Sequence, residues 1–427
     1  MYFNLRHLNL FSSYFAIGFS ALSSICIMYA INHYSGVAFY GDLMFYLSMS
    51  TILFTFFSFG TRETVTKILK YHDKDISVLL SGVILDLFSS FIIICIIYFF
   101  GEKILIFFQK YTANNLHISK LLAVYTVFFI CQSSFIGFLK YYNKILIINL
   151  ASIFQNIVNA LIIGFYILND NTTQSAIILA YVVSVFCGLL FLIFGVLIFL
   201  NFKFVKFSNK TFLNSFSKLY ELSRLYFWAS TGKIGVKNFE NILLMKFLGS
   251  EAVGIYQTLL KILSPINLMT APIGSNYQKI MIDYYHDNKY KKLKELIFRI
   301  TKIVLMITIL YIIIAMVFVD LYLDSQGIHN IEYSTILIFF LGVLSLLQSS
   351  TWWAGNFMIC HFPQIPIFTN IISSILNILV PFYSLYYYGD KGMIVFLISI
   401  VMSQVPAYIV PFYLFRNYLK GEKSTII

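Results

Sequence analysis

The sequence predicts an all-α protein that crosses a membrane about twelve times, in two lobes of six helices around a central cavity. Of its 427 residues, 59% are hydrophobic and only 11% are charged. Soluble domains average about 45–50% apolar and about 25% charged residues. The apolar residues here fall into runs of roughly 20, the length that a helix needs to cross a hydrocarbon core of about 30 Å.

Twelve apolar runs are long enough to be spans. The first follows Arg6 and His7, and it is longer than the apolar part of a signal peptide, so we expect it to be retained as a span. The twelve predicted spans cover residues 8–31, 39–60, 77–99, 119–138, 145–167, 174–200, 219–247, 253–281, 297–319, 332–358, 364–387 and 391–416. An even number of spans places both ends of the chain on one side.

The orientation follows from the lysines and arginines, which gather in the connectors on one side. Of the 30 such residues, 22 lie on the side of the N-terminus, 5 on the opposite side and 3 within spans. Positive residues accumulate in cytoplasmic loops. We therefore expect both termini in the cytoplasm and the chain in a bacterial inner membrane.

Two similar connectors indicate that the lobes are repeats of one unit. Gly36-Val37-Ala38-Phe39-Tyr40-Gly41 joins the first two spans, and Gly249-Ser250-Glu251-Ala252-Val253-Gly254 joins the seventh and eighth. Parallel repeats of this kind occur in transporters. The predicted organisation is a lobe over 1–200, a basic cytoplasmic linker over 201–218, a second lobe over 219–416 and a cytoplasmic tail over 417–427.

The composition argues against nucleic-acid binding and against covalent chemistry. The net charge of +12 is spread over short connectors, whereas nucleic-acid binders gather Lys and Arg on one soluble face. There is no phosphate-binding GxxxxGK[ST] loop and no C-x-x-C pair among the five cysteines. We expect no enzyme activity, no cofactor and no metal, and instead movement of a substrate across the bilayer.

The span over 219–247 contains charges that would be costly in lipid. Each charge at mid-membrane costs roughly 2.5–3.5 kcal/mol on insertion scales. In one continuous helix, Ser230, Lys233, Lys237, Glu240 and Asn241 would share a face. Such a face is expected to line a wet cavity, and its net positive charge suits an anionic substrate. The alternative is a structural ion-pair network that includes a Lys237–Glu240 pair.

Three further charges lie inside or beside spans. Asp86 and Lys261 are each expected either to line the cavity or to be structural partners. Arg62 is either a topology anchor at the cytoplasmic interface or a guanidinium for bidentate phosphate contact. Asp86 and Glu240 are the acids well inside spans, so they are the candidates for coupling transport to H⁺ or Na⁺.

Several segments resemble those of a known family. Residues 247–256, Phe-Leu-Gly-Ser-Glu-Ala-Val-Gly-Ile-Tyr, resemble the F-x-G-x-x-x-V-G-x-Y signature of polysaccharide exporters in the multidrug/oligosaccharidyl-lipid/polysaccharide (MOP) superfamily. Residues 59–63 resemble that family's second helix end, and residues 287–293 resemble its connector after the eighth helix. The similar subgroup is the Wzx-type O-antigen flippases, and the fold implied is the one shared with MATE transporters.

The resemblance implies a function in O-antigen or other surface polysaccharide biosynthesis, including lipopolysaccharide. An undecaprenyl-pyrophosphate-linked oligosaccharide would move from the cytoplasmic to the periplasmic leaflet by alternating access. The implied partners are this lipid-linked substrate, membrane lipids, a polysaccharide polymerase and a chain-length regulator. A general expectation of cavity cations carries over to Arg62, Lys233 and Lys237.

Three other functions remain open. A cation-coupled MATE-type drug antiporter would need cavity carboxylates, but span 8–31 has no Asp or Glu and span 219–247 is net positive. A membrane polymerase or ligase usually places its chemistry in a large external loop, and no connector here is long enough. Exporters of other polysaccharides, including teichoic-type polymers, remain as well.

Overall fold

The computed structural model describes residues 2–69, 76–107, 113–200, 209–234, 238–329, 331, 333–351, 364–388 and 392–419. Thirteen helices account for the regular structure within these ranges. Nine of the described helices are long and apolar enough to cross a membrane, and α11 is a shorter apolar helix. The predicted all-α class is therefore confirmed.

The chain divides into two compact units, Met1–Thr231 and Gly232–Ile427. Most of α8 belongs to the first of them. The boundaries drawn from the sequence, with a linker over 201–218, stay predictions. The two units are described separately below.

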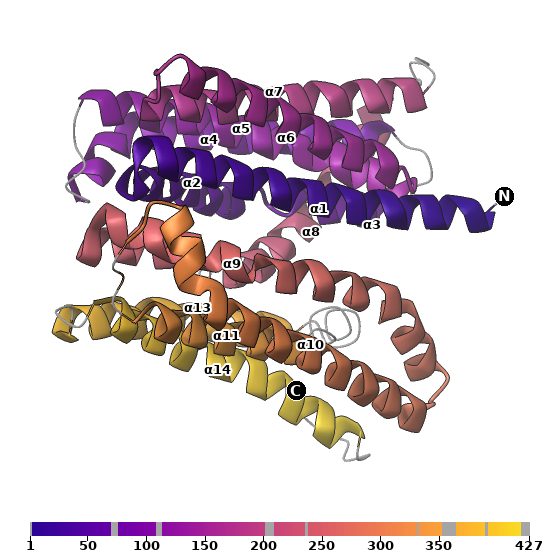
Figure 1. Ribbon diagram of the computed structural model, residues 1–427. Helices are drawn as coiled ribbons and strands as arrows, with labels where there is room; N and C mark the ends of the chain where they lie inside the picture. The colour runs from indigo at the N-terminus through magenta and orange to yellow at the C-terminus, as the bar shows by residue number, and fades with distance from the viewer. Residues whose placement is uncertain are drawn as a thin grey trace. The chain divides into compact units, whose positions relative to one another are not determined.

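The first unit is a bundle in which long helices run side by side (Figure 1). Its central helix is α5, which packs against α2, α3, α4, α6 and α7, while α1 packs against α2 and α6. The helices are α1 (Tyr2–Ser35), α2 (Val37–Phe57), α3 (Thr61–Leu69), α4 (Ile76–Phe107), α5 (Ala113–Tyr141), α6 (Ile145–Leu168), α7 (Gln174–Phe199) and α8 (Asn209–Ile234).

Glycines allow the close packing of α3, α4 and α5. A methyl group at Gly137 on α5 would lie 2.5 Å from the backbone oxygen of Arg62 on α3. One at Gly82 on α4 would lie 2.6 Å from Oγ of Ser134 and 2.8 Å from the Val65 side chain. The missing side chains let the three helices meet in a core that includes Val65, Leu85 and Phe138.

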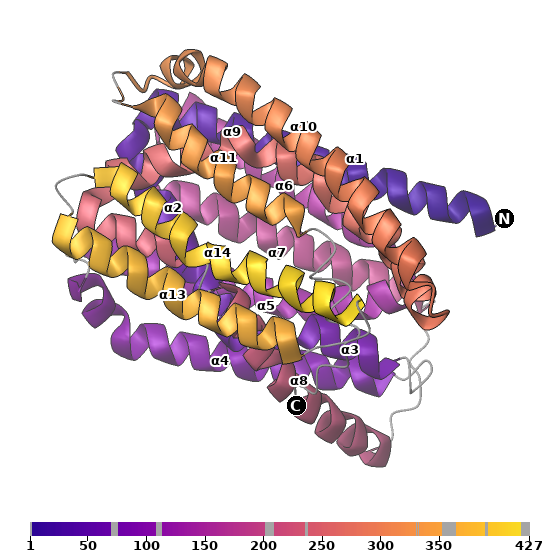
Figure 2. The ribbon, with the colours of Figure 1, turned by 90° about the horizontal axis from the view of Figure 1, so that it is seen from below.

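The described part of the second unit forms five helices, of which α13 and α14 pack along each other (Figure 2). In addition, α10 packs against α9 and α11, and α11 packs against α14. The helices are α9 (Phe239–His286), α10 (Tyr290–Ser325), α11 (Ser334–Ser350), α13 (Gln364–Tyr388) and α14 (Gly392–Leu419). On α10, Phe298, Val317 and Leu321 are exposed, as expected for a helix that faces lipid.

The span predicted over 219–247 is not one continuous helix. The described part of α8 reaches Ile234, Asn238 is a turn, and α9 begins at Phe239. The apolar run overstates the helix, because hydropathy does not record where a helix begins or ends. A second break lies within α9 at Gly249, where φ is 86°, at the expected junction between two spans.

Candidate functional site

The predicted site residues with described side chains lie on three helices. Arg62 is the second residue of α3, and Asp86 lies on α4. Glu240, Asn241 and Lys261 lie on α9. The side chain of Lys233, on α8, and all of Lys237 lie outside the described residues.

The short helix α3 places Arg62 against α5. The turn before it uses left-handed backbone at Phe59 (φ 47°) and Gly60 (φ 60°), so the chain turns sharply after α2. Thr66 on α3 donates to the backbone oxygen of Gly137 at 2.9 Å, which ties the two helices together. The Arg62 side chain is half-buried.

Asp86 is fully buried at the junction of α3, α4 and α5. Its carboxylate accepts hydrogen bonds from Oγ1 of Thr61 at 2.6 Å, from Oγ of Ser134 at 2.5 Å and from the backbone N–H of Ser134 at 3.2 Å. The neighbouring Arg62 attracts the carboxylate electrostatically. Because a buried carboxylate is costly unless it is satisfied, these donors explain how Asp86 is tolerated.

A cavity of about 300 Å³ opens inside the first unit, between α1, α3, α5, α6 and α7. Arg62 is the one charged side chain among its described lining residues. The other polar lining side chains are Ser20, Gln132, Ser152, Gln155 and Asn156. This cavity has the low carboxylate content that suits an anionic or neutral polar ligand, in contrast to a cationic one.

The polar wall of this cavity on α6 was not predicted from the sequence. The lining residues Ser152, Gln155 and Asn156 follow the spacing i, i+3, i+4, which places them on one helix face, and Asn159 continues the pattern at i+7 beyond the cavity lining. This spacing of polar residues is visible in the sequence within the apolar run 145–167. Averaged hydropathy hides it because the surrounding residues are strongly apolar.

Gly188 on α7 brings two of the amides close together. A methyl group there would lie 2.7 Å from Oε1 of Gln155 and 3.1 Å from Nε2 of Gln132. Gln132 is buried and donates to the backbone oxygen of Val185 at 2.9 Å, which fixes its position. Within the described part of the chain, Gln155 has no hydrogen-bond partner. Its amide is therefore available to a ligand.

Glu240 and Asn241 are buried in the second unit and take part in a polar network. Glu240 accepts hydrogen bonds from the hydroxyl of Tyr256 and from Nε2 of Gln404 at 3.4 Å. Asn241 accepts one from Nε2 of Gln257 at 2.7 Å. These contacts join the first turn of α9 to its longer part and to α14. The other half of the predicted Lys237–Glu240 pair, Lys237, lies outside the described residues.

The network continues toward α11 through Tyr408. Its hydroxyl donates to Oε1 of Gln404 at 3.3 Å and also hydrogen-bonds Gln348. Lys261 lies further along α9, where it is partly buried and its backbone oxygen accepts from Ser264 at 2.8 Å. Buried polar networks of this kind are costly unless satisfied, so their members are expected to be sensitive to substitution.

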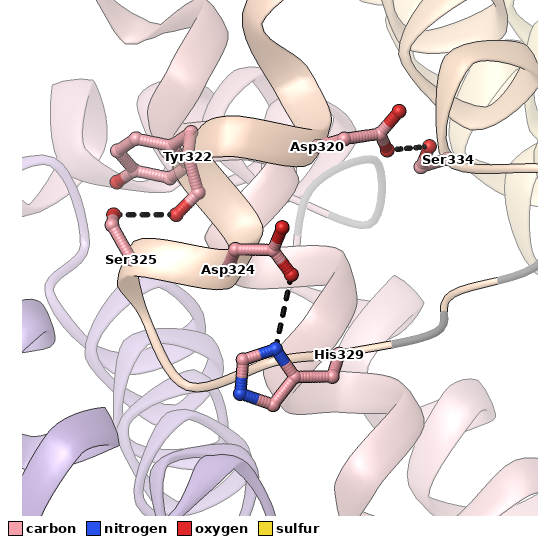
Figure 3. A network of polar contacts seen from close by, with 6 residues as sticks. All are labelled: Asp320, Tyr322, Asp324, Ser325, His329 and Ser334. Carbon is pink, nitrogen blue, oxygen red and sulfur yellow. Dashed lines mark hydrogen bonds and ion pairs between the residues drawn. The ribbon is translucent and has the colours of Figure 1, made fainter.

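In the second unit, polar contacts lie at the connection between α10 and α11 (Figure 3). Ser334 at the start of α11 donates to Asp320 on α10. The exposed Asp324 and His329 lie 3.0 Å apart across the same turn. At the other end of α10, an exposed contact of 2.6 Å with Asp287 raises the pKa of Lys289. Among the described residues, no group of three or more His, Cys, Asp or Glu could hold a metal ion.

Comparison with known proteins identifies the fold. No family model and no curated protein sequence matches the chain. A MATE protein in complex with MaL6 is similar, with a TM-score of 0.69, 16% identity and coverage of 97% of this chain and 96% of that chain. An inward-facing multidrug resistance MATE transporter of the MOP superfamily gives a TM-score of 0.66, 14% identity and 96% coverage of both chains.

A third similar structure is a MOP superfamily transporter from Pyrococcus furiosus, described by a reverse polarity of its binding pocket that suggests a different function. It gives a TM-score of 0.64 and 14% identity, and it covers 98% of this chain and 96% of that chain. The chain therefore has the fold of the MATE and MOP transporters over nearly its whole length.

Proposed function

We propose that this chain is a flippase that moves an undecaprenyl-pyrophosphate-linked oligosaccharide from the cytoplasmic to the periplasmic leaflet by alternating access. The observation that carries the proposal is the cavity in the first unit. Arg62 is the charged side chain among its described lining residues, and the remaining polar groups are amides and hydroxyls. A cavity of this chemistry favours a sugar-linked phosphate.

The physical reason is the strength of charge interactions away from water. At low dielectric a guanidinium attracts a phosphate far more strongly than it does in bulk water. The planar guanidinium can also contact a phosphate through two hydrogen bonds. Lys233 and Lys237 add two positive charges in the apolar run 219–247, which leaves that segment net positive beside Glu240. Their proposed role is to attract the same diphosphate.

The proposed setting is a bacterial inner membrane with both termini in the cytoplasm. The basis is the bias of 22 to 5 in the lysines and arginines of the connectors. There the protein would act in surface polysaccharide biosynthesis, including O-antigen and lipopolysaccharide. A polymerase and a chain-length regulator would use the unit that it delivers, and membrane lipids would surround its apolar helices.

The test is flipping by the purified chain in lipid vesicles. A fluorescent polyprenyl-diphosphate sugar is placed in both leaflets, and the fraction reached by an external quencher or hydrolase is followed. Wild type should equilibrate the lipid between leaflets. Arg62→Lys should slow the reaction mildly, Arg62→Ala more, and Arg62→Glu most, because a carboxylate repels the diphosphate.

Lys67→Ala is the matched control, since Lys67 is an exposed cation on the same short helix, outside the lining of the cavity. This variant should flip the lipid at the wild-type rate. If wild type leaves the lipid in its original leaflet, the proposal is wrong. If Arg62→Glu at wild-type abundance flips normally, the role of the cavity is wrong.

A cation-coupled drug antiporter is the second candidate. The observation in its favour is that each unit contains a buried carboxylate, Asp86 in the first and Glu240 in the second. A buried acid can couple transport to H⁺ or Na⁺ when its charge state changes with access. Efflux of cationic dyes from the same vesicles, driven by an imposed gradient and without flipping of the diphosphate lipid, would favour this candidate.

A further inference from the structure

The cavity in the first unit has two chemically different walls. Gln132, Gln155 and Asn156 present amides from α5 and α6. Arg62 presents a guanidinium from α3. A guanidinium alone would suffice for a phosphate, and the amide wall offers hydrogen bonds to a second kind of ligand group.

Amide side chains suit sugar hydroxyls. Each amide offers two N–H donors and one oxygen acceptor, and each sugar hydroxyl can donate and accept. Small-molecule pockets combine a few placed polar groups with apolar surface. Here Phe129, Ile136 and Leu192 supply that surface. Phe129 packs against Phe54, with ring centroids 4.5 Å apart, so its own ring is held in place.

The size of the cavity limits what can enter. Its volume of about 300 Å³ lies at the lower end of the roughly 300–1,000 Å³ typical of small-molecule pockets. This volume suits a single sugar ring with its phosphate.

We infer that this cavity is a subsite for the sugar attached directly to the pyrophosphate, with Gln132, Gln155 and Asn156 binding its hydroxyls and Arg62 binding the adjoining phosphate. The inference rests on the proposed function and narrows it. The protein recognises the sugar-phosphate junction that all repeat units on this lipid share, and the outer sugars stay outside the subsite.

The test measures binding of soluble fragments to the full chain in lipid nanodiscs by titration calorimetry. The probes are the 1-phosphates of glucose, galactose and N-acetylglucosamine. Inorganic phosphate and the free sugars, the two components of each probe, are measured separately for comparison. At least one glycosyl phosphate should bind at least about tenfold more tightly than inorganic phosphate or the free sugar, because the guanidinium and the amides bind one ligand together.

Two variants address the amide wall. Gln155→Leu removes the amide at similar size. Gly188→Ala places a methyl group 2.7 Å from Oε1 of Gln155, whose flexible side chain must move away. Each should weaken binding of the glycosyl phosphate about 3- to 10-fold, the effect of one lost hydrogen bond, and leave binding of inorganic phosphate unchanged.

Gly164→Ala is the matched control for the glycine variant. Gly164 lies on α6, and a methyl group there meets no atom within 4 Å. Its binding should equal that of wild type. If all three glycosyl phosphates bind no better than inorganic phosphate, or if Gln155→Leu and Gly188→Ala bind them as wild type does, the sugar subsite is wrong.

Flipping by the same variants separates this inference from the proposed function. If Gln155→Leu flips the glycosylated lipid at the wild-type rate while wild type is active, the subsite fails and the flippase stands. If wild type flips no diphosphate lipid but binds a glycosyl phosphate in a Gln155-dependent way, the flippase fails and the subsite stands.

Discussion

Gly36 and Gly249 have the same unusual backbone conformation, although they lie 213 residues apart. Gly36, between α1 and α2, has φ 85° and ψ 161°. Gly249, within α9, has φ 86° and ψ −175°. This region of backbone space is essentially restricted to glycine. The match supports the repeat that the two Gly-x4-Gly connectors predict.

The first prediction concerns these two glycines. Gly36→Ala and Gly249→Ala should each reduce stability by about 1–3 kcal/mol, the typical strain of a side chain in this conformation. Steric contact adds nothing, because a methyl group at either site meets no atom within 4 Å. Thermal unfolding of the purified protein, followed by the fraction that remains monodisperse, measures the loss.

Gly18→Ala is the control, since Gly18 also has open space but lies in the ordinary backbone of α1. Alanine is the better helix former, so this variant should be as stable as wild type or more so. If Gly36→Ala were as stable as Gly18→Ala, the predicted backbone strain at Gly36 would be wrong.

The second prediction concerns the contact between α3 and α5. Gly137→Ala should lower stability by about 1–3 kcal/mol, because its methyl group would overlap the backbone oxygen of Arg62 and backbone cannot move aside cheaply. The displaced helix should also reduce flipping, since Arg62 leaves its place at the cavity. Thermal unfolding and vesicle flipping give the two measurements. A variant with wild-type values in both would show that α3 is not held as described.

The third prediction separates structural from coupling roles of the buried acids. Asp86→Asn replaces a carboxylate that accepts three hydrogen bonds with an amide that turns its N–H₂ group toward a donor, so stability should fall by about 1–3 kcal/mol. If Asp86 or Glu240 couples transport to H⁺ or Na⁺, Asp86→Asn or Glu240→Gln should slow flux in folded protein and remove its dependence on the gradient.

The readout is flux with and without an uncoupler, normalised to folded protein. Thr61→Val removes one donor to Asp86 but keeps the acid, so it should lower stability without changing the response to the gradient. Normal flux in both acid variants, together with wild-type flux that ignores a collapsed gradient, would assign both acids a structural role.

The fourth prediction concerns the lysines before α9. Export should fall in the order Lys233→Arg, Lys233→Ala, Lys233→Glu, with the same order at Lys237, because their positive charge attracts the diphosphate. Surface polysaccharide measures export, and a membrane immunoblot controls for abundance. Normal export by Lys233→Glu at normal abundance would contradict an anion-binding role.

A double variant tests whether Lys237 acts through Glu240. Lys237→Ala with Glu240→Ala restores the local charge balance, although it also leaves Tyr256 and Gln404 without the carboxylate that they contact. Normal export by this variant would make the pair structural and leave Lys233 as the candidate.

The fifth prediction concerns orientation. Reporter fusions after Asn171 and Gln326 should read as periplasmic, and fusions after Lys210 and Lys289 as cytoplasmic. Asn171 and Gln326 follow α6 and α10, and Lys289 precedes α10, so a span separates Lys289 from Gln326. Reversed readings at any two of these sites would overturn the twelve-span topology.

The local sequence pattern determined the helical class and one of the junctions between helices. Apolar runs of spanning length predict helices because the backbone must satisfy its own hydrogen bonds in lipid. Gly249 marks a junction in the sequence and in the structure because its conformation needs glycine. The span over 219–247 was predicted as one helix, but Asn238 is a turn, since hydropathy records the apolar run and not the start of α9 at Phe239.

Only tertiary packing decided which polar residues meet. Asp86 finds its donors 25 residues before it at Thr61 and 48 residues after it at Ser134. The cavity combines side chains of five helices, and no local pattern connects Arg62 with Gln155. The physical reason is that periodicity assigns a residue to a face of its own helix, whereas the close approach allowed by Gly82, Gly137 and Gly188 determines which other helix that face meets.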